Sequence, residues 1–140
     1  MLQNPSETVN AHYTAIIQKD LPDILNKYHA TENTYVVLEG PRLTTIGYSK
    51  IAKGWTDFCA SPITLTSINW TEGPLEGSTE KMAWIAGIIE LNITINGKPL
   101  TNTFRASFVL INHSNKWLIQ HEHVSVAHPN PYGVGDWLKA

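Results

Sequence analysis

Two histidines near the end of the chain have a spacing that suits acid-base chemistry. His121 and His123 lie two residues apart in a segment that alternates like a β-strand, so we expect both side chains on one face of a sheet, about 7 Å apart. An imidazole there could serve as an acid, a base or a metal ligand. The alternative is that both rings satisfy neighbouring polar groups and serve packing alone. A metal needs a third and a fourth ligand, for which no candidate is obvious, so no metal site is predicted.

Arg105 is the second candidate. It lies between Phe104 and Ala106 on a strand that we expect to be buried on both faces, and a buried guanidinium requires a partner. One partner is Glu90, diagonal to Arg105 in the predicted hairpin, which would form a structural ion pair. The other is a carboxylate or enolate oxygen of a ligand. Ser107 lies on the same predicted face and is assigned to the ligand pocket with Glu90.

Further candidates come from the helical part of the sequence and from aromatic residues. Asp20 either caps a helix that begins at the next residue or points into a pocket as a general base with a raised pKa. Tyr13, Tyr28, Trp55 and Trp84 stand at core-facing positions, where each could line a pocket and orient a ligand with its polar tip. Plain core packing is the alternative for each of these aromatic residues.

The residues that would position these side chains form helices first and strands afterwards. Apolar residues at helical spacing predict helices over 6–19 and from Leu21 to Tyr28. A third helix is predicted after Gly47, with Ser49 as a possible cap and Pro62 beyond its end. Residues rich in β-branched and aromatic side chains predict a strand over 34–38 with a short return over 43–46. From Ile63 onward the period is two, which predicts strands over 63–72, 81–96, 99–112 and 116–126.

Two local signals refine the predicted sheet. The apolar phase slips by one residue between Leu65 and Ile68, which predicts a β-bulge and a bent strand. The Asn96-Gly97 pair predicts a two-residue hairpin turn that pairs Ile95 with Lys98, Ile89 with Phe104 and Ile88 with Arg105. One hairpin face is then almost wholly apolar and the other mixes apolar and polar groups. We therefore expect helices to cover one face and another subunit to cover the other, which predicts a homodimer through the sheet.

Composition narrows the class of protein. The chain has 140 residues, 42% of them hydrophobic and 16% charged, with a net charge of −2. One ordered domain over 1–140 is expected, with an irregular tail over 127–140, and the missing basic runs argue against nucleic acid. The single cysteine fits a reducing compartment, the chain lacks a long apolar stretch, and the predicted location is the cytoplasm, away from membranes. Nucleotide-binding, hydrolase-elbow and zincin motifs do not occur, and no cofactor is predicted.

The order and spacing of several residues resemble the nuclear transport factor 2-like superfamily, and within it the SnoaL-like proteins. The resemblance is carried by Tyr13, Asp20-Leu21, Tyr28, Gly47, Trp55, Ala83-Trp84-Ile85, Arg105 and the W-x-I-x-H-x-H-x-S ending at 117–125. It implies an α+β fold of cystatin-like type, a cone of three N-terminal helices packed on a highly curved antiparallel sheet around an apolar pocket. Relatives of this fold include isomerases, cyclases, dehydratases and association domains, so the fold alone does not name the chemistry.

Two functions follow as hypotheses. In the first, the protein binds a small apolar or carboxylate-bearing molecule, and an enzyme of this kind would be a cofactor-free isomerase, cyclase or dehydratase. A His or Asp would move the proton, and Arg105 or a tyrosine would stabilise the oxyanion. In the second, the domain is a non-catalytic association module, assembled through the apolar face of residues 83–110. A binding protein without turnover fits the sequence equally well.

Overall fold

Helices and short strands alternate in the first half of the chain, and long strands fill the second half. The computed structural model describes residues 3–138. The elements are α1 (Pro5–Gln18), α2 (Leu21–Leu25), β1 (Tyr35–Val37), β2 (Thr45–Ile46), α3 (Tyr48–Ala60), β3 (Ile63–Ser78), β4 (Met82–Ile95), β5 (Lys98–His113) and β6 (Lys116–Ser125). The architecture is α+β, and the predicted elements form at the expected places, with α3 following β1 and β2. Residues 1–2 and 139–140, the ends of the predicted domain and tail, lie outside the described residues.

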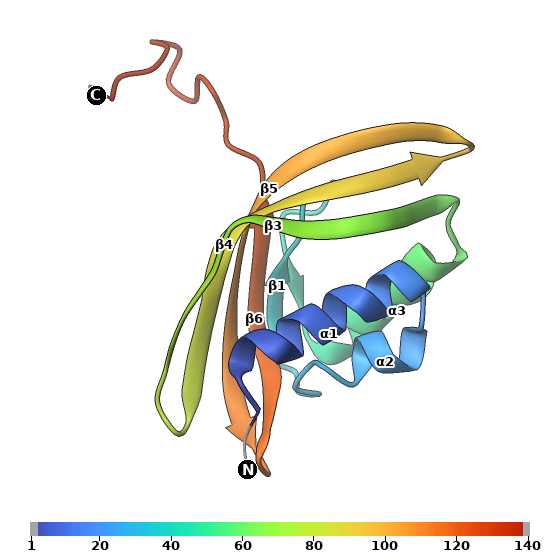
Figure 1. Cartoon of the computed structure of the whole chain (residues 1–140), viewed down its shortest axis with the longest axis vertical. Coiled ribbons are helices and arrows are strands. Elements are labelled where there is room, and N and C mark those ends of the chain that lie inside the picture. The colour runs from blue at the N-terminus through green and yellow to red at the C-terminus, as the bar shows by residue number, and fades with distance from the viewer. Residues whose placement is uncertain (1–2, 139–140) are drawn as a thin grey trace.

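The strands form one curled, unclosed sheet (Figure 1) in the order β2-β1-β6-β5-β4-β3. The expectation of a purely antiparallel sheet is wrong at one place, because β1 runs parallel to β6 and pairs Tyr35 with His121. The reason lies just before β1. There the backbone of residues 27–29 already runs beside β6, with His29 N–H donating to the Ile119 carbonyl and Ile119 N–H donating to the Lys27 carbonyl. The chain therefore enters the sheet along β6 and only then turns back as β2.

Irregular pairing bends β3. The register shifts between Leu65 and Ser67, which confirms the predicted bulge. The strand continues past residue 72, where Gly73 and Pro74 suggested its end, because two further register shifts absorb these residues while pairing with β4 resumes at Leu75. Close approach of the two backbones at the bend requires a glycine, since a Cβ on Gly87 would overlap the carbonyl oxygen of Glu72.

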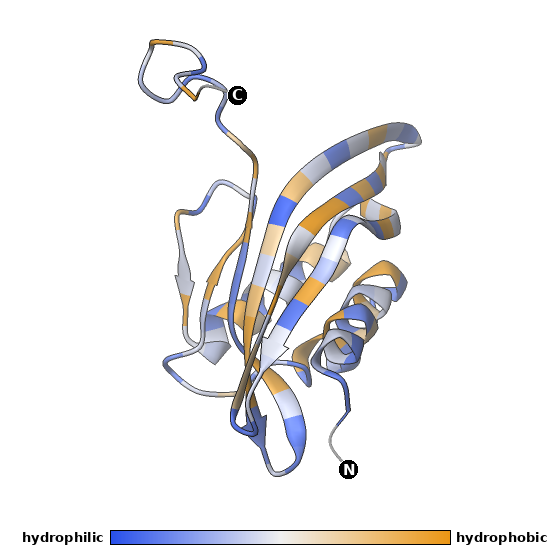
Figure 2. Cartoon of the chain, turned by 60° about the vertical axis from the view of Figure 1, so that its left-hand side comes forward, coloured by the Kyte–Doolittle hydropathy of each residue, from blue (hydrophilic) through white to orange (hydrophobic). Residues whose placement is uncertain are grey.

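The β4–β5 hairpin has the predicted register, including Ile95 with Lys98, Ile89 with Phe104 and Ile88 with Arg105. Its apolar face is the inner, concave face of the sheet, on which α1 lies (Figure 1), and its central residues Ile85, Ile89, Phe108 and Leu110 are buried in the core. This face is therefore not free to assemble copies of the chain. Hydrophobic and hydrophilic residues alternate along the strands (Figure 2), as expected for a sheet whose two faces differ.

Two helix starts show how the loops are fixed. Asp20 is the N-cap of α2 and its carboxylate accepts from Asp23 N–H at 3.2 Å, as one of the two predicted roles requires. The predicted cap Ser49 is wrong, because α3 begins at Tyr48 after Gly47, whose φ is 94°. The backbone N–H groups of Gly47 and Tyr48 instead donate to carbonyls in the loop before β1, so no capping side chain is needed.

The regular structure ends at Ser125, and residues 126–138 form an irregular segment that extends away from the sheet (Figure 1). This segment is called the tail below. Within residues 3–138, every helix is too short or too polar to cross a membrane.

Candidate functional site

A β-bulge in β6 decides which of its side chains face the interior. Val109 of β5 pairs with His121, whereas its neighbour Leu110 pairs with Ile119, so Gln120 is an extra residue in β6. An extra residue reverses the alternation of the strand. Ile119 points inward before the bulge, and after it the inward residue is Glu122, which pairs with Phe108 of the inner face. The carboxyl group between the two predicted histidines is thus the one that enters the core.

Glu122 is 2% exposed and is hydrogen-bonded to Tyr28, whose oxygen in turn meets two side chains from the helical half of the chain. The Tyr28 hydroxyl donates to Glu122 Oε1 at 2.5 Å. Trp55 Nε1, from α3, donates to the Tyr28 oxygen at 3.0 Å, and His12 Nε2, from α1, lies 3.2 Å from the same oxygen. A tyrosine oxygen has one proton and two lone pairs. Tyr28 donates its proton in the hydrogen bond to Glu122 and accepts from Trp55, and with His12 as a third neighbour its hydrogen-bonding capacity is filled.

His12 is fully enclosed by the protein. Its Nε2 lies 3.2 Å from the Tyr28 oxygen, and a backbone hydrogen bond to Ile24 also acts on the ring. Burial, together with the positive charge of Lys27, lowers the pKa of His12 from 6.5 to about 3. The Ile24 hydrogen bond opposes this shift without reversing it, so the ring is neutral at physiological pH.

Burial has the opposite effect on the acid. It raises the pKa of Glu122 from 4.5 to about 7, helped by the carboxylate of Glu39 and opposed by the Tyr28 hydrogen bond. Removal from water disfavours the charged form of a carboxyl group. A group with a pKa near the working pH can both take and give a proton, which is the requirement for general acid-base catalysis.

Tyr13 supplies an unused polar atom. Its ring packs against Phe108, the residue paired with Glu122, with ring centroids 5.9 Å apart. Its hydroxyl is buried without a hydrogen-bond partner among the described residues. Burial and the nearby Glu122 carboxylate raise the pKa of Tyr13 well above its usual range, so the hydroxyl keeps its proton and remains a donor. A buried, unpaired hydroxyl costs stability, on the order of 1–3 kcal/mol.

The predicted site residues are divided by the sheet. Tyr13 and Trp55 face the interior, as expected. The others lie on the outer, convex face or at its edge: Trp84, Glu90, Arg105, Ser107, His121 and His123. They are half-buried or exposed there.

The outer-face residues have partners of their own. The expectation that Arg105 is buried is wrong: the side chain is exposed, and Nη2 donates to Ser125 Oγ at 3.1 Å and to the Val126 carbonyl at 3.0 Å. Nδ1 of His121 lies 2.9 Å from the Tyr35 carbonyl, and its ring stacks on that of Tyr35. Catalytic roles for Arg105, His121 and His123 stay predictions of the sequence, and the geometry favours the inner face.

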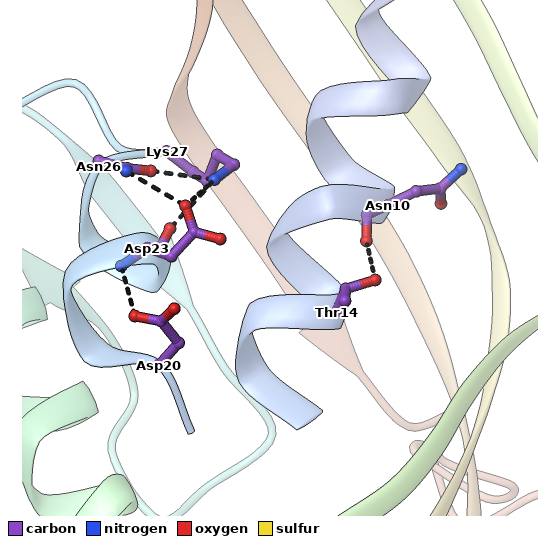
Figure 3. A network of polar contacts seen from close by, with 6 residues as sticks. All are labelled: Asn10, Thr14, Asp20, Asp23, Asn26 and Lys27. Atoms are coloured by element: carbon purple, nitrogen blue, oxygen red, sulfur yellow. Dashed lines mark hydrogen bonds and ion pairs between the residues drawn. The ribbon is translucent and has the colours of Figure 1, made fainter. Parts of the chain in front are cut away.

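Asp20 belongs neither to the interior residues nor to those of the outer face. Figure 3 shows it at the start of α2, bonded to the backbone of Asp23, in a surface network that also holds Lys27. Its side chain is committed to the cap, and Asp20 is exposed. Within residues 3–138, three or more His, Cys, Asp or Glu side chains do not gather into a group that could hold a metal ion.

Glu122 and His12 are the residues that the sequence did not assign to the site, and Tyr28 was considered only as one of four aromatic residues that could line a pocket. One signal could have found Glu122. The inward residues of β6 change phase between Ile119 and Val124, and only a bulge places both inside. The same kind of slip identified the bulge in β3. Tyr28 and His12 stand on the inner sides of helical segments, but nothing in one sequence shows that they meet a carboxylate.

The fold places the chain in a known structural class. Its structure is similar to an NTF2-like superfamily protein from Salmonella enterica serovar Typhimurium, with a TM-score of 0.79 at 19% identity over 93% of both chains. It is also similar to a ketosteroid isomerase-like protein from Erwinia carotovora atroseptica, with a TM-score of 0.70 at 17% identity over 89% of this chain and 94% of the other. The chain therefore has the nuclear transport factor 2-like fold.

The family follows from the sequence. The SnoaL-like domain family matches residues 6–129, and the chain belongs to it. A further similar structure is an assigned calcium/calmodulin-dependent protein kinase type II association domain from Thiobacillus denitrificans, with a TM-score of 0.73 at 15% identity over 91% of this chain and 98% of that one. A comparison with curated proteins finds no match. At these identities the similar structures establish the fold alone.

Proposed function

We propose that this domain binds a small, neutral, largely apolar carbonyl compound between α1 and the concave face of the sheet, and moves a proton on it without a cofactor. The observation that carries the proposal is Glu122. Its carboxyl group is enclosed, burial raises its pKa to about 7, and its charge acts on the buried Tyr13 hydroxyl, which has no hydrogen-bond partner among the described residues. A domain built only for stability gains nothing from such an arrangement, since each of these groups costs free energy to bury.

The chemistry needs one base and one donor. The Glu122 carboxylate takes a proton from the carbon next to the carbonyl, and the electron pair of that C–H bond becomes the enolate, with its charge on oxygen. The Tyr13 hydroxyl, a free donor, hydrogen-bonds that oxygen. Glu122 then returns the proton to the same or another carbon, and the carbonyl is restored. Isomerisation, cyclisation and dehydration each begin with this step.

Tyr28 acts as a positioning residue. Its hydroxyl is saturated by Glu122, Trp55 and His12, so it has no free proton for a substrate. By donating to Glu122 it fixes the orientation of the carboxyl group, and it keeps the pKa lower than burial alone would set it.

The charged groups near the proposed site favour a neutral ligand over one that carries a carboxylate. Arg105, the expected partner of a ligand carboxylate, lies on the outer face. Lys27, the cation that acts on His12, is bonded to Asp23 at 2.8 Å. A ligand carboxylate would meet Glu122 with no free cation beside it. We therefore place neutral carbonyl compounds ahead of carboxylate-bearing ones.

The test uses 2-tetralone, an apolar ketone with acidic α-hydrogens, in deuterated buffer. Proton NMR follows the loss of the α-hydrogen signals as deuterium replaces them. The wild-type protein is expected to accelerate exchange over buffer, and Glu122→Gln to lower the acceleration by about 100-fold or more. Glu90→Gln, a glutamate of the outer face, is the matched control and keeps the wild-type rate. Equal rates for Glu122→Gln and the wild type, or no acceleration by the wild type, would contradict the proposal.

We also propose that two copies associate through the outer face of the sheet. The observation is that apolar residues occupy this face without cover from any described element, among them Val37, Ile88 and Val109, which are half-buried. Ile88→Lys should convert a dimer to monomers in sedimentation-velocity experiments. A dimer that persists in this variant would remove the outer face from the interface.

A further inference from the structure

Large exposed apolar side chains gather at two places in the described chain. Eight of the eleven belong either to the tail or to one patch at the β3–β4 end of the outer face. The tail residues are Val126, Tyr132, Val134, Trp137 and Leu138, each between 56% and 73% exposed. The patch, called the hairpin patch below, consists of Leu75, Met82 and Trp84, each between 48% and 56% exposed. Exposed apolar groups on this scale mark contact surfaces.

The hairpin patch is continuous on one side of the sheet. Met82 and Trp84 are two apart on β4 and so share a face, and Leu75 pairs with Ala86, the next residue on that face. The Trp84 ring lies over Gly77, its cross-strand partner, where any side chain would overlap the indole. The patch therefore presents a flat aromatic ring flanked by two flexible apolar side chains.

The tail is directed away from this patch by its attachment. Arg105 binds Ser125 Oγ and the Val126 carbonyl, so it clamps the chain where the tail leaves β6. Beyond this clamp the tail runs toward one end of the molecule, and the β3–β4 hairpin extends toward the other (Figure 1). Within the tail, Asn130 Oδ1 accepts from Gly135 N–H at 2.7 Å, and the Tyr132 and Trp137 rings lie 6.3 Å apart. The tail thus has a turn of its own and makes aromatic contacts only with itself.

We infer that the tail is an arm that docks on the hairpin patch of a second copy of the chain. A two-fold axis across the outer face would bring the tail of each copy to the opposite end of its partner, where the patch lies. This single two-fold rotation would then place each tail on the hairpin patch of the other copy, in two identical contacts. The match to the SnoaL-like family ends at residue 129, so most of the arm is a feature of this chain beyond the matched domain. The inference rests on the proposed association through the outer face and names the segment that secures it.

Cross-linking separates docking on a partner from docking on the same chain. At up to about 3.3–3.6 Å per residue the tail is long enough to fold back, so both geometries must be distinguished. The background is Cys59→Ala, which removes the only cysteine. A chain with Val134→Cys is mixed with a chain carrying Met82→Cys and mildly oxidised. The expected product is a covalent heterodimer, and the double variant Val134→Cys/Met82→Cys should also form covalent dimers.

Two outcomes would overturn the inference. The double variant could close into an internally bridged monomer, which would show docking within one chain. Alternatively, Val134→Cys could react with Met82→Cys no better than with Leu43→Cys, a control cysteine at an exposed apolar position outside the patch.

Sedimentation equilibrium gives a second, independent readout. The double variant Tyr132→Ser/Trp137→Ser should raise the dimer dissociation constant by at least about tenfold, while Leu43→Ser leaves it unchanged. If Ile88→Lys separates the copies and the tail variant does not, the association stands and the arm is refuted. If neither variant changes the assembly, both the proposed association through the outer face and the proposed arm are refuted. Exchange of 2-tetralone should be the same in the tail variant as in the wild type, because the arm lies outside the proton-transfer site.

Discussion

The two faces of β6 carry neighbouring ionisable residues in opposite environments. Glu122 is enclosed by α1, α3 and the Tyr28 segment, and burial raises its pKa to about 7. His121 and His123 lie on the other face, where His121 is half-buried against Tyr35 and His123 is exposed. The residue types alone favoured the histidines as the acid or base. The comparison teaches that the face on which a residue lies decides whether it is suited to proton transfer, because side chains are shielded from water on the inner face only.

The largest expected effect is a difference in the free energy of unfolding between variants of two adjacent isoleucines of β4. Ile89 is a core residue of the inner face, whereas Ile88 is half-buried on the outer face. Ile89→Ala should lower the free energy of unfolding by about 2–5 kcal/mol, since it removes buried methylene groups and leaves a cavity. Ile88→Ala should change it by less than about 1 kcal/mol at protein concentrations where the chain is monomeric. Urea denaturation measures both.

A concentration series completes this comparison. The effect of Ile89→Ala should be the same at all protein concentrations, and the effect of Ile88→Ala should grow as concentration rises and copies associate. Similar losses for the two variants in the monomer would contradict the assignment of the faces.

The pH dependence of stability tests the buried pair of ionisable groups. Between pH 4.5 and 6.5 folded Glu122 holds a proton that the unfolded chain has lost, and unfolded His12 holds a proton that the folded chain has lost. The first effect makes stability fall as pH rises, the second makes it rise, and the two oppose each other. The wild-type free energy of unfolding should therefore change less across this window than either effect alone would make it. Glu122→Gln should uncover the His12 effect, a rise on the order of 3 kcal/mol from pH 4.5 to 6.5.

The reciprocal variant sharpens the same test. His12→Asn leaves the Glu122 effect alone, so stability should fall as pH rises through 4.5 toward 7, the raised pKa of the folded state. Chemical denaturation at a series of pH values gives these slopes. A Glu122→Gln profile parallel to that of the wild type would show that Glu122 titrates normally.

Two tyrosines of the interior should respond differently to loss of a hydroxyl. Tyr28→Phe removes the donor to Glu122 and the acceptor of Trp55, and should cost about 1–3 kcal/mol. Tyr13→Phe removes a hydroxyl without a partner, so the free energy of unfolding should stay the same or increase. Thermal unfolding measures this, and 2-tetralone exchange should nevertheless slow in Tyr13→Phe. A stability loss in Tyr13→Phe as large as in Tyr28→Phe would show that the Tyr13 hydroxyl has a structural partner.

The smallest expected effect is that of the outer-face arginine. Arg105→Met should change the free energy of unfolding of the monomer by less than about 1 kcal/mol, because the side chain is exposed and its hydrogen bonds compete with water. It should weaken dimerisation, since the tail loses its clamp. Lys at the same position, which keeps a charge but not the planar fork, should behave like Met. Loss of 2-tetralone exchange in Arg105→Met with dimers intact would instead place Arg105 in the chemistry.

Much of the fold follows from local patterns, and the site does not. The Asn96-Gly97 turn fixes the β4–β5 register, and the phase slip after Leu65 locates a bulge, because turn type and alternation are properties of neighbouring residues. The parallel pairing of β1 with β6 depends on contacts between distant segments. The prediction of the site residues on β6 was wrong for a related reason. One extra residue, Gln120, exchanges the faces on which His121 and Glu122 lie.

The most direct test of the proton-transfer site is the pKa of the Glu122 carboxyl group. Carbon-13 labelling of the glutamate side chains, with Glu122→Gln to assign the signal, allows an NMR titration from pH 4 to 9. The account predicts that the assigned carboxyl carbon titrates with a midpoint near pH 7. A midpoint near 4.5, the ordinary value for glutamate, would show that water reaches the carboxyl group and would contradict the account.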